Sequence, residues 1–232
     1  MDSSELLRRI GERAAAEVQE GAIVGLGTGS TAEAMLLALG ERVKAGLTLT
    51  GVATSHRTRD LCRELRIPVA DLDDVERVDL CIDGADEIDP HVNVVKGRGG
   101  ALLFEKLVAR QADRYVIIAS HEKLVPKLGV RLPLPVEIVP LGWRRTSALI
   151  ADLGVTPVLR TNADGSPYLT DGGHYILDCT APDGGFADVE ALAEALKLTT
   201  GVVEHGFFLD MVDLALTIDG TGAITEHHPA TA

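Results

Sequence analysis

Two glycine-rich stretches of the sequence have the composition of anion-binding turns. The first, GLGTGST from Gly25 to Thr31, follows a short apolar run and opens a helical pattern. The second, KGRGG from Lys96 to Gly100, also leads into a helical pattern and carries two cations. Backbone N–H groups at the start of a helix have no internal partner and lie at the positive end of the helix dipole. Because glycines let that backbone close on an anion, each stretch is a candidate phosphate site.

The first stretch favours a small phosphate ester over a nucleotide. Its further donors are the hydroxyls of Thr28, Ser30 and Thr31. A dinucleotide site fits poorly, because GxGxxG requires glycine where Ser30 stands and no acid follows the next predicted strand at Ala53-Thr54-Ser55. No Walker-type GKS or GKT occurs. The structural alternatives are a tight strand-to-helix turn for the first stretch and a surface connection for the second.

Two carboxylates, Asp83 and Asp86, follow the apolar run VDLCI within the stretch DGADEIDP. Ligands of open α/β sheets bind beyond the carboxyl ends of the strands, so both side chains are expected near a substrate. Gly84 permits the sharp turn between them. Carboxylates at this spacing could accept hydrogen bonds from sugar hydroxyls. The alternative is an acidic solvated loop, which is common in a chain this negative.

Glu105 is a carboxylate in the middle of an apolar helical stripe, and this makes it the candidate general base. The stripe is formed by Ala101, Leu102, Val108, Ala109 and Ala112. The polar Lys106 and Arg110 are expected well round the helix. Desolvation would raise the pKa of Glu105 and suit it to take and return a proton. The alternative is a glutamate paired with an arginine at a packed subunit edge. Lys123, after the strand predicted to end at Ala119, is a further candidate cation, or an ordinary surface lysine.

The elements that must position these residues alternate between strands and helices, which predicts an α/β fold with a Rossmann-like parallel sheet. The first part is expected to contain strands at 22–26, 49–53, 78–82 and 115–119 and helices at 5–19, 31–44, 55–65 and 101–112. LPLP at 132–135 is expected to break regular structure. Beyond it, strands at 136–139, 175–178 and 202–205, helices at 143–153 and 189–198, and a hairpin-like segment turning at 162–165 predict a smaller ferredoxin-like α+β subdomain. We therefore expect a catalytic domain of residues 1–130 and 207–232, with a last strand at 212–218, and a subdomain of 131–206.

The composition excludes several classes of partner. A net charge of −13 argues against binding to nucleic acid or to acidic membrane surfaces. No apolar run approaches the ~18 residues of a membrane span, and the N-terminus lacks the pattern of a secretory signal, so a cytoplasmic protein is expected. Three scattered cysteines fit a reducing compartment. Neither the cysteines nor the histidines have metal-ligand spacing, and no metal or cofactor is expected.

Taken in order, GLGTGST, DGADEIDP, KGRGGALLFEK, HEK and LPLPVEI resemble ribose-5-phosphate isomerase of the A type, from about residue 5 to residue 219. The resemblance implies cofactor-free interconversion of D-ribose 5-phosphate and D-ribulose 5-phosphate, with Glu105 moving a proton through a cis-enediol. It also implies a Rossmann-like domain plus a small subdomain, in homodimers or homotetramers. The substrate site implied by the matching positions comprises Thr28, Gly29, Ser30, Thr31, Asp83, Gly84, Ala85, Asp86, Lys96, Gly97, Arg98, Gly99 and Lys123.

Charge assigns roles within that set. Lys96, Lys123 and the hydroxyl turn are expected at the phosphate and the developing enediolate oxygen. Asp83 and Asp86 are expected to orient hydroxyls and assist ring opening, which makes Glu105, Asp83, Asp86 and Lys96 the expected catalytic set.

Two positions depart from the family pattern. Some relatives have a lysine in the first helix that helps hold the phosphate; here the position is Leu7, followed by Arg8 and Arg9, and Arg8 is the candidate substitute. Arg98 stands where glycine is frequent, and it either points to solvent or tightens phosphate binding.

Two other functions stay open on the sequence alone. A sugar-phosphate sensor domain of a transcription regulator would carry a helix-turn-helix, and only about 20 residues precede the first strand. An acyl- or CoA-transferring relative, with the glutamate as nucleophile, would need a larger chain or a partner subunit and a CoA-sized cleft.

Overall fold

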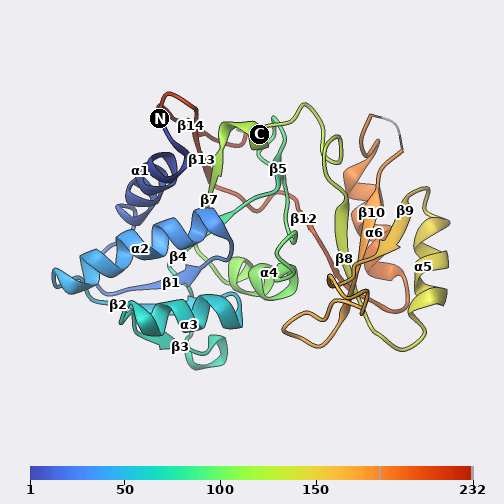
Figure 1. The fold of residues 1–232 in the computed structure, drawn as a ribbon, viewed down its shortest axis with the longest axis horizontal. Coiled ribbons are helices and arrows are strands. Elements are labelled where there is room, and N and C mark those ends of the chain that lie inside the picture. The colour runs from blue at the N-terminus through green and yellow to red at the C-terminus, as the bar shows by residue number, and fades with distance from the viewer. Residues whose placement is uncertain (183, 231–232) are drawn as a thin grey trace. The chain divides into compact units, whose positions relative to one another are not determined.

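The computed structural model describes residues 1–182 and 184–230, which divide into two compact units (Figure 1). The first unit comprises Met1–Ala85, Phe104–Lys123 and Asp210–Ala232, and the second comprises Asp86–Leu103 and Leu124–Leu209. This division differs from the expected boundaries at 130/131 and 206/207. The reason is a small sheet in which β6 (Val94–Val95) pairs with both β5 (Glu87–Ile88) and β12 (Phe207–Phe208) and so draws these segments into the second unit.

The first unit is built on a seven-stranded sheet with the order β14-β13-β7-β4-β1-β2-β3. Adjacent strands are parallel except at β14, which is antiparallel to β13. The bounds are β1 Ala22–Leu26, β2 Leu49–Ala53, β3 Val69–Ala70, β4 Leu80–Gly84, β7 Tyr115–Ser120, β13 Leu214–Ile218 and β14 Ile224–His227. The expected strands are present and the last predicted strand joins this sheet, which confirms the parallel α/β class. The edge strands β3 and β14 were not predicted from the sequence.

The order of the chain reverses between β1 and β4. From β1 the chain moves outward through β2 and β3, returns to β4 on the other side of β1, and continues to β7 and β13. Leu26 of β1 lies in register with Ile82 of β4, so the carboxyl ends of the two strands meet. Ligands of doubly wound sheets bind at such a switch point. The turn after β1 and the end of β4 therefore lie where a substrate is expected.

The helices of the first unit cover both faces of this sheet. They are α1 Ser3–Ala15, α2 Ser30–Lys44, α3 His56–Glu64 and α4 Leu102–Arg110, of which α4 begins in residues of the second unit. Helices α1 and α2 lie side by side (Figure 1). Glycine at position 11 of α1 permits this close approach, since a Cβ there would lie 2.5 Å from the backbone of Ala34 in α2. Val24 and Leu26 of β1 belong to the same apolar core as α1 and α2, whereas Gly25 faces Val108 of α4. Since successive residues of a strand point to opposite faces, α4 lies on the face opposite α1 and α2.

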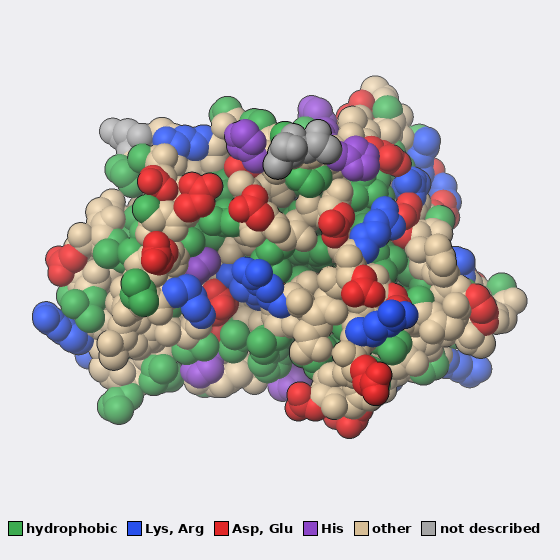
Figure 2. Space-filling model, turned by 180° about the vertical axis from the view of Figure 1, so that it is seen from behind, with side chains coloured by type: hydrophobic (Ala, Val, Ile, Leu, Met, Phe, Trp, Pro, Cys, Tyr) green, Lys and Arg blue, Asp and Glu red, His purple; other side chains and the backbone are tan. Residues whose placement is uncertain are grey.

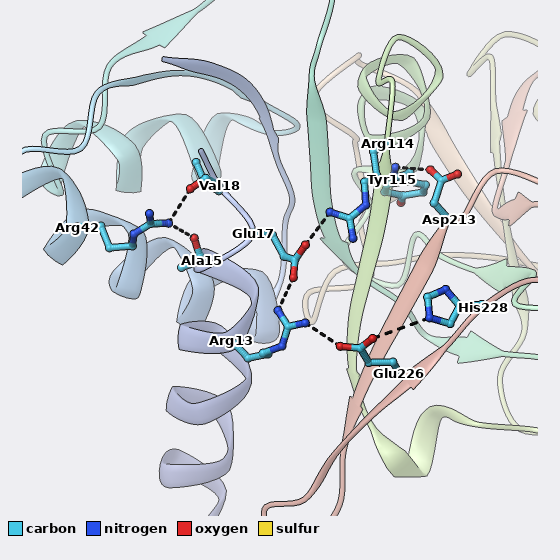
Figure 3. Close-up of polar contacts among 10 residues, drawn as sticks. All are labelled: Arg13, Ala15, Glu17, Val18, Arg42, Arg114, Tyr115, Asp213, Glu226 and His228. Carbon is cyan, nitrogen blue, oxygen red and sulfur yellow. Dashed lines mark hydrogen bonds and ion pairs between the residues drawn. The ribbon is translucent and has the colours of Figure 1, made fainter. Parts of the chain in front are cut away.

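A group of ion pairs ties α1 to the strands of the sheet (Figure 3). Arg13 of α1 binds Glu17 and also Glu226 of β14, the latter at 2.7 Å. Glu17 binds Arg114, directly before β7, at 2.6 Å. Burial would raise the pKa of Glu17, but the hydrogen bonds from Arg13 and Arg114 outweigh it, so that the pKa lies below its usual value.

The second unit contains an antiparallel four-stranded sheet with the order β11-β8-β10-β9. Its elements follow one another as β8 Leu134–Ile138, α5 Trp143–Ala151, β9 Thr156–Leu159, β10 Tyr175–Thr180, α6 Val189–Leu198 and β11 Val202–His205. This βαββαβ order confirms the ferredoxin-like subdomain. The expectation that LPLP breaks regular structure is wrong for Leu134 and Pro135, which begin β8. Proline has no N–H to donate, but its carbonyl accepts a hydrogen bond from the Gly206 N–H at 2.8 Å, so Pro135 still takes part in the backbone hydrogen bonding of this region.

Candidate functional site

The first glycine turn, residues 27–31, connects β1 directly to α2 and is fixed by β4. The N–H of Gly27 donates to Ile82 O at 2.9 Å, and the N–H of Thr28 donates to Asp83 Oδ1 at 3.0 Å. A Cβ at position 27 would lie 2.2 Å from Asp83 Oδ1, so only glycine fits there. Gly29 has φ 107°, a conformation that L side chains rarely adopt. The turn is therefore shaped by a buried carboxylate and two glycines.

Helix α2 begins at this turn without a side-chain cap. Its N-cap is Gly29, which makes no side-chain hydrogen bond, whereas Asp2, Ser55 and Asp188 cap α1, α3 and α6. Helix α5, which begins after Gly142, also has no side-chain cap. The missing cap of α2 therefore indicates an anion site only because α2 begins at the switch point of the sheet. Ser30 is exposed and Thr31 is half-buried. The N–H groups of the first turn of α2 and these two hydroxyls can therefore serve an anion.

Thr28 differs from its neighbours in the turn. Its hydroxyl lies 2.9, 2.8 and 3.0 Å from the hydroxyls of Thr54, Ser55 and Thr58. Its N–H is used by Asp83. Thr28 was expected to donate its hydroxyl to an anion, but the structure directs that hydroxyl into the protein, toward the start of α3.

Asp83 is completely buried and lies within β4, one residue before its end, rather than after the strand as expected. Its Oδ1 accepts from the N–H groups of Thr28 and Gly84, at 3.0 and 2.7 Å. Burial is the main cause that raises the pKa of Tyr115 well above its ordinary value, with a smaller electrostatic contribution from Asp83.

Glu105 is 4 % exposed and lies in the first turn of α4. Three residues later Val108 packs on β1, where a Cβ on Gly25 would lie 2.6 Å from Val108 Cγ1. Arg110 is exposed as expected, but Lys106 is buried at 7 % exposure. The expectation that Lys106 lies on a polar outer face is therefore wrong, because α4 is covered over more than its apolar stripe. Glu105 itself occupies the buried position that the stripe predicted.

The second glycine turn, residues 96–100, belongs to the second unit. Asp86 Oδ2 accepts from the Arg98 N–H at 2.9 Å. Arg160 donates to the carbonyls of Gly97 and Arg98, both at 3.0 Å, and is itself paired with Asp178. Arg160 lies in no sequence motif and was not predicted as a site residue. A cation thus holds two carbonyls of this turn, the Tyr168 hydroxyl donates to the carbonyl of Gly99 at 3.3 Å, and a carboxylate accepts from one of its N–H groups.

Lys96 is a buried cation at the start of that turn. It is 2 % exposed, its N–H donates to Gly206 O at 2.9 Å, and its Nζ lies 5.6 Å from the centre of the Phe208 ring. Arg98 and Gly99, by contrast, are exposed. Of the two alternatives for Arg98, its exposure agrees with a side chain that points to solvent.

The remaining expected residues of the first unit lie near strand ends. Gly84 ends β4, and Ala85 is the last residue of that segment of the unit. Lys123 ends the 3-10 helix His121–Lys123 that follows β7, the neighbour of β4. The turn at 28–31, Asp83 and Lys123 therefore all lie at the carboxyl ends of the adjacent strands β1, β4 and β7.

Arg8 does not have the environment of a phosphate ligand. Its guanidinium pairs with Glu5 and Glu12 along its own helix, at 2.7 and 2.5 Å. These two hydrogen bonds raise the pKa of Arg8. The structure therefore gives no support to Arg8 as a substitute for the lysine of some relatives.

The remaining features bear on partners and metals. Figure 2 shows Lys and Arg side chains scattered among acidic ones on the face it presents, without a continuous basic patch. Among residues 1–182 and 184–230, no cluster of three or more His, Cys, Asp or Glu side chains is arranged to hold a metal ion. Within the same residues, none of the helices has the length and apolar character of a membrane span. The three cysteines are all buried and unpaired with one another.

Comparison with known proteins gives a consistent result. The model of the family described as ribose 5-phosphate isomerase A (phosphoriboisomerase A) matches residues 50–222. A ribose-5-phosphate isomerase A from Thermomicrobium roseum is 49% identical over 223 residues, which cover 96% of this chain and 93% of the relative. The solved ribose 5-phosphate isomerase from Plasmodium falciparum is 33% identical, with a TM-score of 0.94 over 98% of this chain and all of that one. A ribose-5-phosphate isomerase in complex with phospho-erythronic acid is 31% identical, with a TM-score of 0.93 and coverage of 98% and 100%.

Proposed function

The chain belongs to the ribose 5-phosphate isomerase A family, and from that premise we propose how its residues divide the work of the reaction. The protein is an aldose–ketose isomerase that interconverts D-ribose 5-phosphate and D-ribulose 5-phosphate, a step of the pentose phosphate pathway. Chemically, one proton must leave C2 of the open-chain aldose, one must arrive at C1, and the proton on O2 must move to O1.

Glu105 is the proposed general base. It takes the C2 proton to give a cis-enediolate and returns a proton to C1. The observation that carries this role is its position: a carboxylate at 4 % exposure on an otherwise apolar stripe of α4. A desolvated carboxylate is a stronger base than one in water, which suits proton abstraction next to a carbonyl.

The first glycine turn is the proposed phosphate cradle. The N–H groups at the start of α2 and the hydroxyls of Ser30 and Thr31 would donate to the phosphate oxygens. Lys123, which follows β7, the strand next to β4, would add a positive charge. Thr28 and Gly29 shape the turn, because the Thr28 hydroxyl and N–H are engaged within the protein and Gly29 adopts φ 107°.

For the enediolate oxygen we assign Lys96, a buried cation at the start of the second turn. Gly97, Arg98 and Gly99 form the rest of that turn. Asp83 and Asp86 are proposed to orient substrate hydroxyls and to assist ring opening. Each uses one carboxylate oxygen to hold a glycine turn, and a carboxylate has about four acceptor sites, so both tasks are compatible.

No metal or cofactor takes part in this scheme, so ribose 5-phosphate should be converted in the presence of EDTA. Replacement of Glu105 by Gln should lower kcat by about 10² or more, since the base is lost while the shape is kept. Glu137→Gln is the matched control, because Glu137 is also buried, at 1 % exposure, and burial raises its pKa. The control should keep kcat within a few-fold. Full activity of Glu105→Gln would refute the proposed base, and loss of wild-type activity in EDTA would refute the metal-free scheme.

We further propose that the protein acts in the cytoplasm as a homodimer or homotetramer. Cys62, Cys81 and Cys179 are buried and form no disulfide with one another, which agrees with a reducing compartment. Leu141 and Leu198, both in the second unit, are exposed at 89% and 78%, as residues at a subunit contact would be in an isolated chain. Light scattering at micromolar concentration should give the mass of two or four chains, and the mass of a single chain would contradict the proposal.

A further inference from the structure

We propose that Thr54, Ser55 and Thr58 are positioning residues for the phosphate turn. The hydroxyls of Thr54 and Thr58 hold the carbonyls of Leu26 and Gly27, and all three hydroxyls lie within hydrogen-bond distance of the Thr28 hydroxyl and occupy its proton. The turn then presents backbone N–H groups, rather than carbonyl oxygens or the Thr28 hydroxyl, to the phosphate. This inference rests on the proposed function of that turn.

Two consecutive peptide groups at the entry to the turn are held at both ends. In the Leu26–Gly27 peptide, Thr54 Oγ1 donates to the carbonyl at 2.9 Å while the N–H donates to Ile82 O at 2.9 Å. In the Gly27–Thr28 peptide, Thr58 Oγ1 donates to the carbonyl at 2.9 Å while the N–H donates to Asp83 Oδ1 at 3.0 Å. Because a peptide group is planar with its C=O and N–H opposed, these contacts fix its orientation. The direction of approach to Gly29 and Ser30 is fixed as a result.

The positions of the hydroxyl protons follow from these contacts. Thr54 and Thr58 have one hydroxyl proton each, and each gives it to a carbonyl. Ser55 gives its proton to Thr58 Oγ1 at 3.1 Å. All three hydroxyls therefore face Thr28 as acceptors, and the single hydroxyl proton of Thr28 is shared among them. Thr28 has no second proton to offer to a phosphate.

Thr58 is the centre of this cluster. It donates once, to Gly27 O, and accepts twice, from Ser55 and Thr28, which fills the hydrogen-bonding capacity of a hydroxyl. Its side chain is buried at 3 % exposure, where an unmade hydrogen bond is not replaced by water. Loss of this one hydroxyl would release the Gly27 carbonyl and leave the Ser55 hydroxyl without its acceptor, while Thr28 would keep Thr54 and Ser55 as neighbours.

Sheet pairing brings the cluster to the turn. Strand β2 lies parallel to β1, with Ala53 in register with Leu26, so the residues after β2 reach the residues after β1. Ser55 is also the N-cap of α3 and accepts from the Thr58 N–H at 3.0 Å. The cap that starts α3 thus also orders the turn that starts α2.

Thr58→Val tests the inference, because it keeps the shape of the side chain and removes the hydroxyl. The dissociation constant of inorganic phosphate and the KM for ribose 5-phosphate should each rise about 10-fold, while kcat should stay within about threefold, since Glu105 is untouched. Thr58→Ser restores the hydroxyl and should return both constants to within about twofold of wild type.

Thr217→Val is the matched control. Thr217 is a buried threonine of the first unit, at 1 % exposure, whose hydroxyl bonds to His227 at 2.8 Å, far from the turn in the sheet order. It should lose stability without a change in phosphate binding. If it weakens phosphate binding as much as Thr58→Val does, the weaker binding results from a general loss of stability and the inference is wrong.

The remaining outcomes separate this inference from the proposed function. A folded Thr58→Val that binds phosphate as wild type does would overturn the positioning role. If Thr58→Val does not fold, Thr54→Val is the second test, because it removes the hydroxyl that donates to the Leu26 carbonyl. This variant must then weaken phosphate binding. Wild type that fails to bind phosphate at tens of millimolar would instead overturn the phosphate role of the turn itself.

Discussion

The two glycine turns have similar compositions but are held by different chemistry. In both, a carboxylate accepts a backbone N–H: Asp83 for Thr28 and Asp86 for Arg98. Neutral hydroxyls hold the carbonyls of Leu26 and Gly27 at the entry to the first turn. In the second turn the guanidinium of Arg160 holds the carbonyls of Gly97 and Arg98, and the Tyr168 hydroxyl donates to Gly99 O at 3.3 Å. The first turn thus leaves backbone N–H groups and the hydroxyls of Ser30 and Thr31 for the proposed phosphate, whereas Lys96, Arg98 and Arg160 gather positive charge at the second turn. The glycines of a turn therefore indicate where the backbone can approach a ligand. The donors around the turn determine which group of the ligand the turn can bind.

The largest expected effect on stability comes from adding a Cβ to one glycine of each turn, because the two glycines differ in the space around them. In the first turn, a Cβ at position 27 would lie 2.2 Å from Asp83 Oδ1 and 2.6 Å from Asp83 Cα. Gly27→Ala should therefore lower the free energy of unfolding by more than about 4 kcal/mol or prevent folding. In the second turn, a Cβ on Gly99 meets no atom within 4 Å. Gly99→Ala should change stability by less than about 0.5 kcal/mol in urea unfolding, and equal effects of the two variants would contradict the comparison.

The next effect concerns the cation that holds the second turn. Arg160→Met removes two hydrogen bonds to carbonyls and leaves Asp178 without its partner at a site where the Arg160 side chain is 15% exposed. The free energy of unfolding should fall by about 3 kcal/mol. Arg63→Met is the control, because Arg63 pairs with Asp60 at the surface, with side chains 68% and 66% exposed, and should cost less than about 0.5 kcal/mol. A neutral Arg160→Met would mean that the second turn does not depend on this cation.

The smallest effect lies outside both turns and depends on pH. The pKa of Glu17 is lowered in the folded protein, so its stabilisation is present above the ordinary value of 4.5 and is lost as pH falls through the lower folded pKa. Glu17→Gln should therefore be about 1–2 kcal/mol less stable than wild type at pH 7, and this difference should shrink below pH 4.5. Glu41→Gln, which changes an exposed pair with Lys44, should show less than about 0.5 kcal/mol at either pH. A Glu17 difference that is constant with pH would show that the ion pairs do not stabilise the fold.

The sequence predicted those features that leave a local pattern. Buried parallel strands are apolar runs, and the stripe around Glu105 has the period of a helix, so both were found. Strands of two residues, such as β5, β6 and β12, have no period to detect. Lys106 was misplaced because the period of one apolar face does not reveal what covers the rest of α4. Pro135 resembled a break because its place in β8 depends on a partner, Gly206, that is distant in the sequence.

The site shows the same limit at the level of single atoms. The residue types of the first turn pointed to an anion, but the direction of the Thr28 hydroxyl depends on Thr54, Ser55 and Thr58, which become neighbours only when β1 and β2 pair. A run of hydroxyl residues at the carboxyl end of β2 was the available signal. Arg160 left no signal, since its contacts with the second turn arise from the fold of the second unit alone.

The central claim is that Glu105 carries the proton between C2 and C1, and isomerisation in D₂O tests it most directly. Nuclear magnetic resonance of the product can follow the hydrogen at C1 of ribulose 5-phosphate. We expect deuterium at C1 in the product of the wild type, because a carboxylic acid exchanges its proton with solvent, and at least about 10²-fold slower product formation by Glu105→Gln. Product that retains all of the original hydrogen, formed at an unchanged rate by Glu105→Gln, would contradict the account.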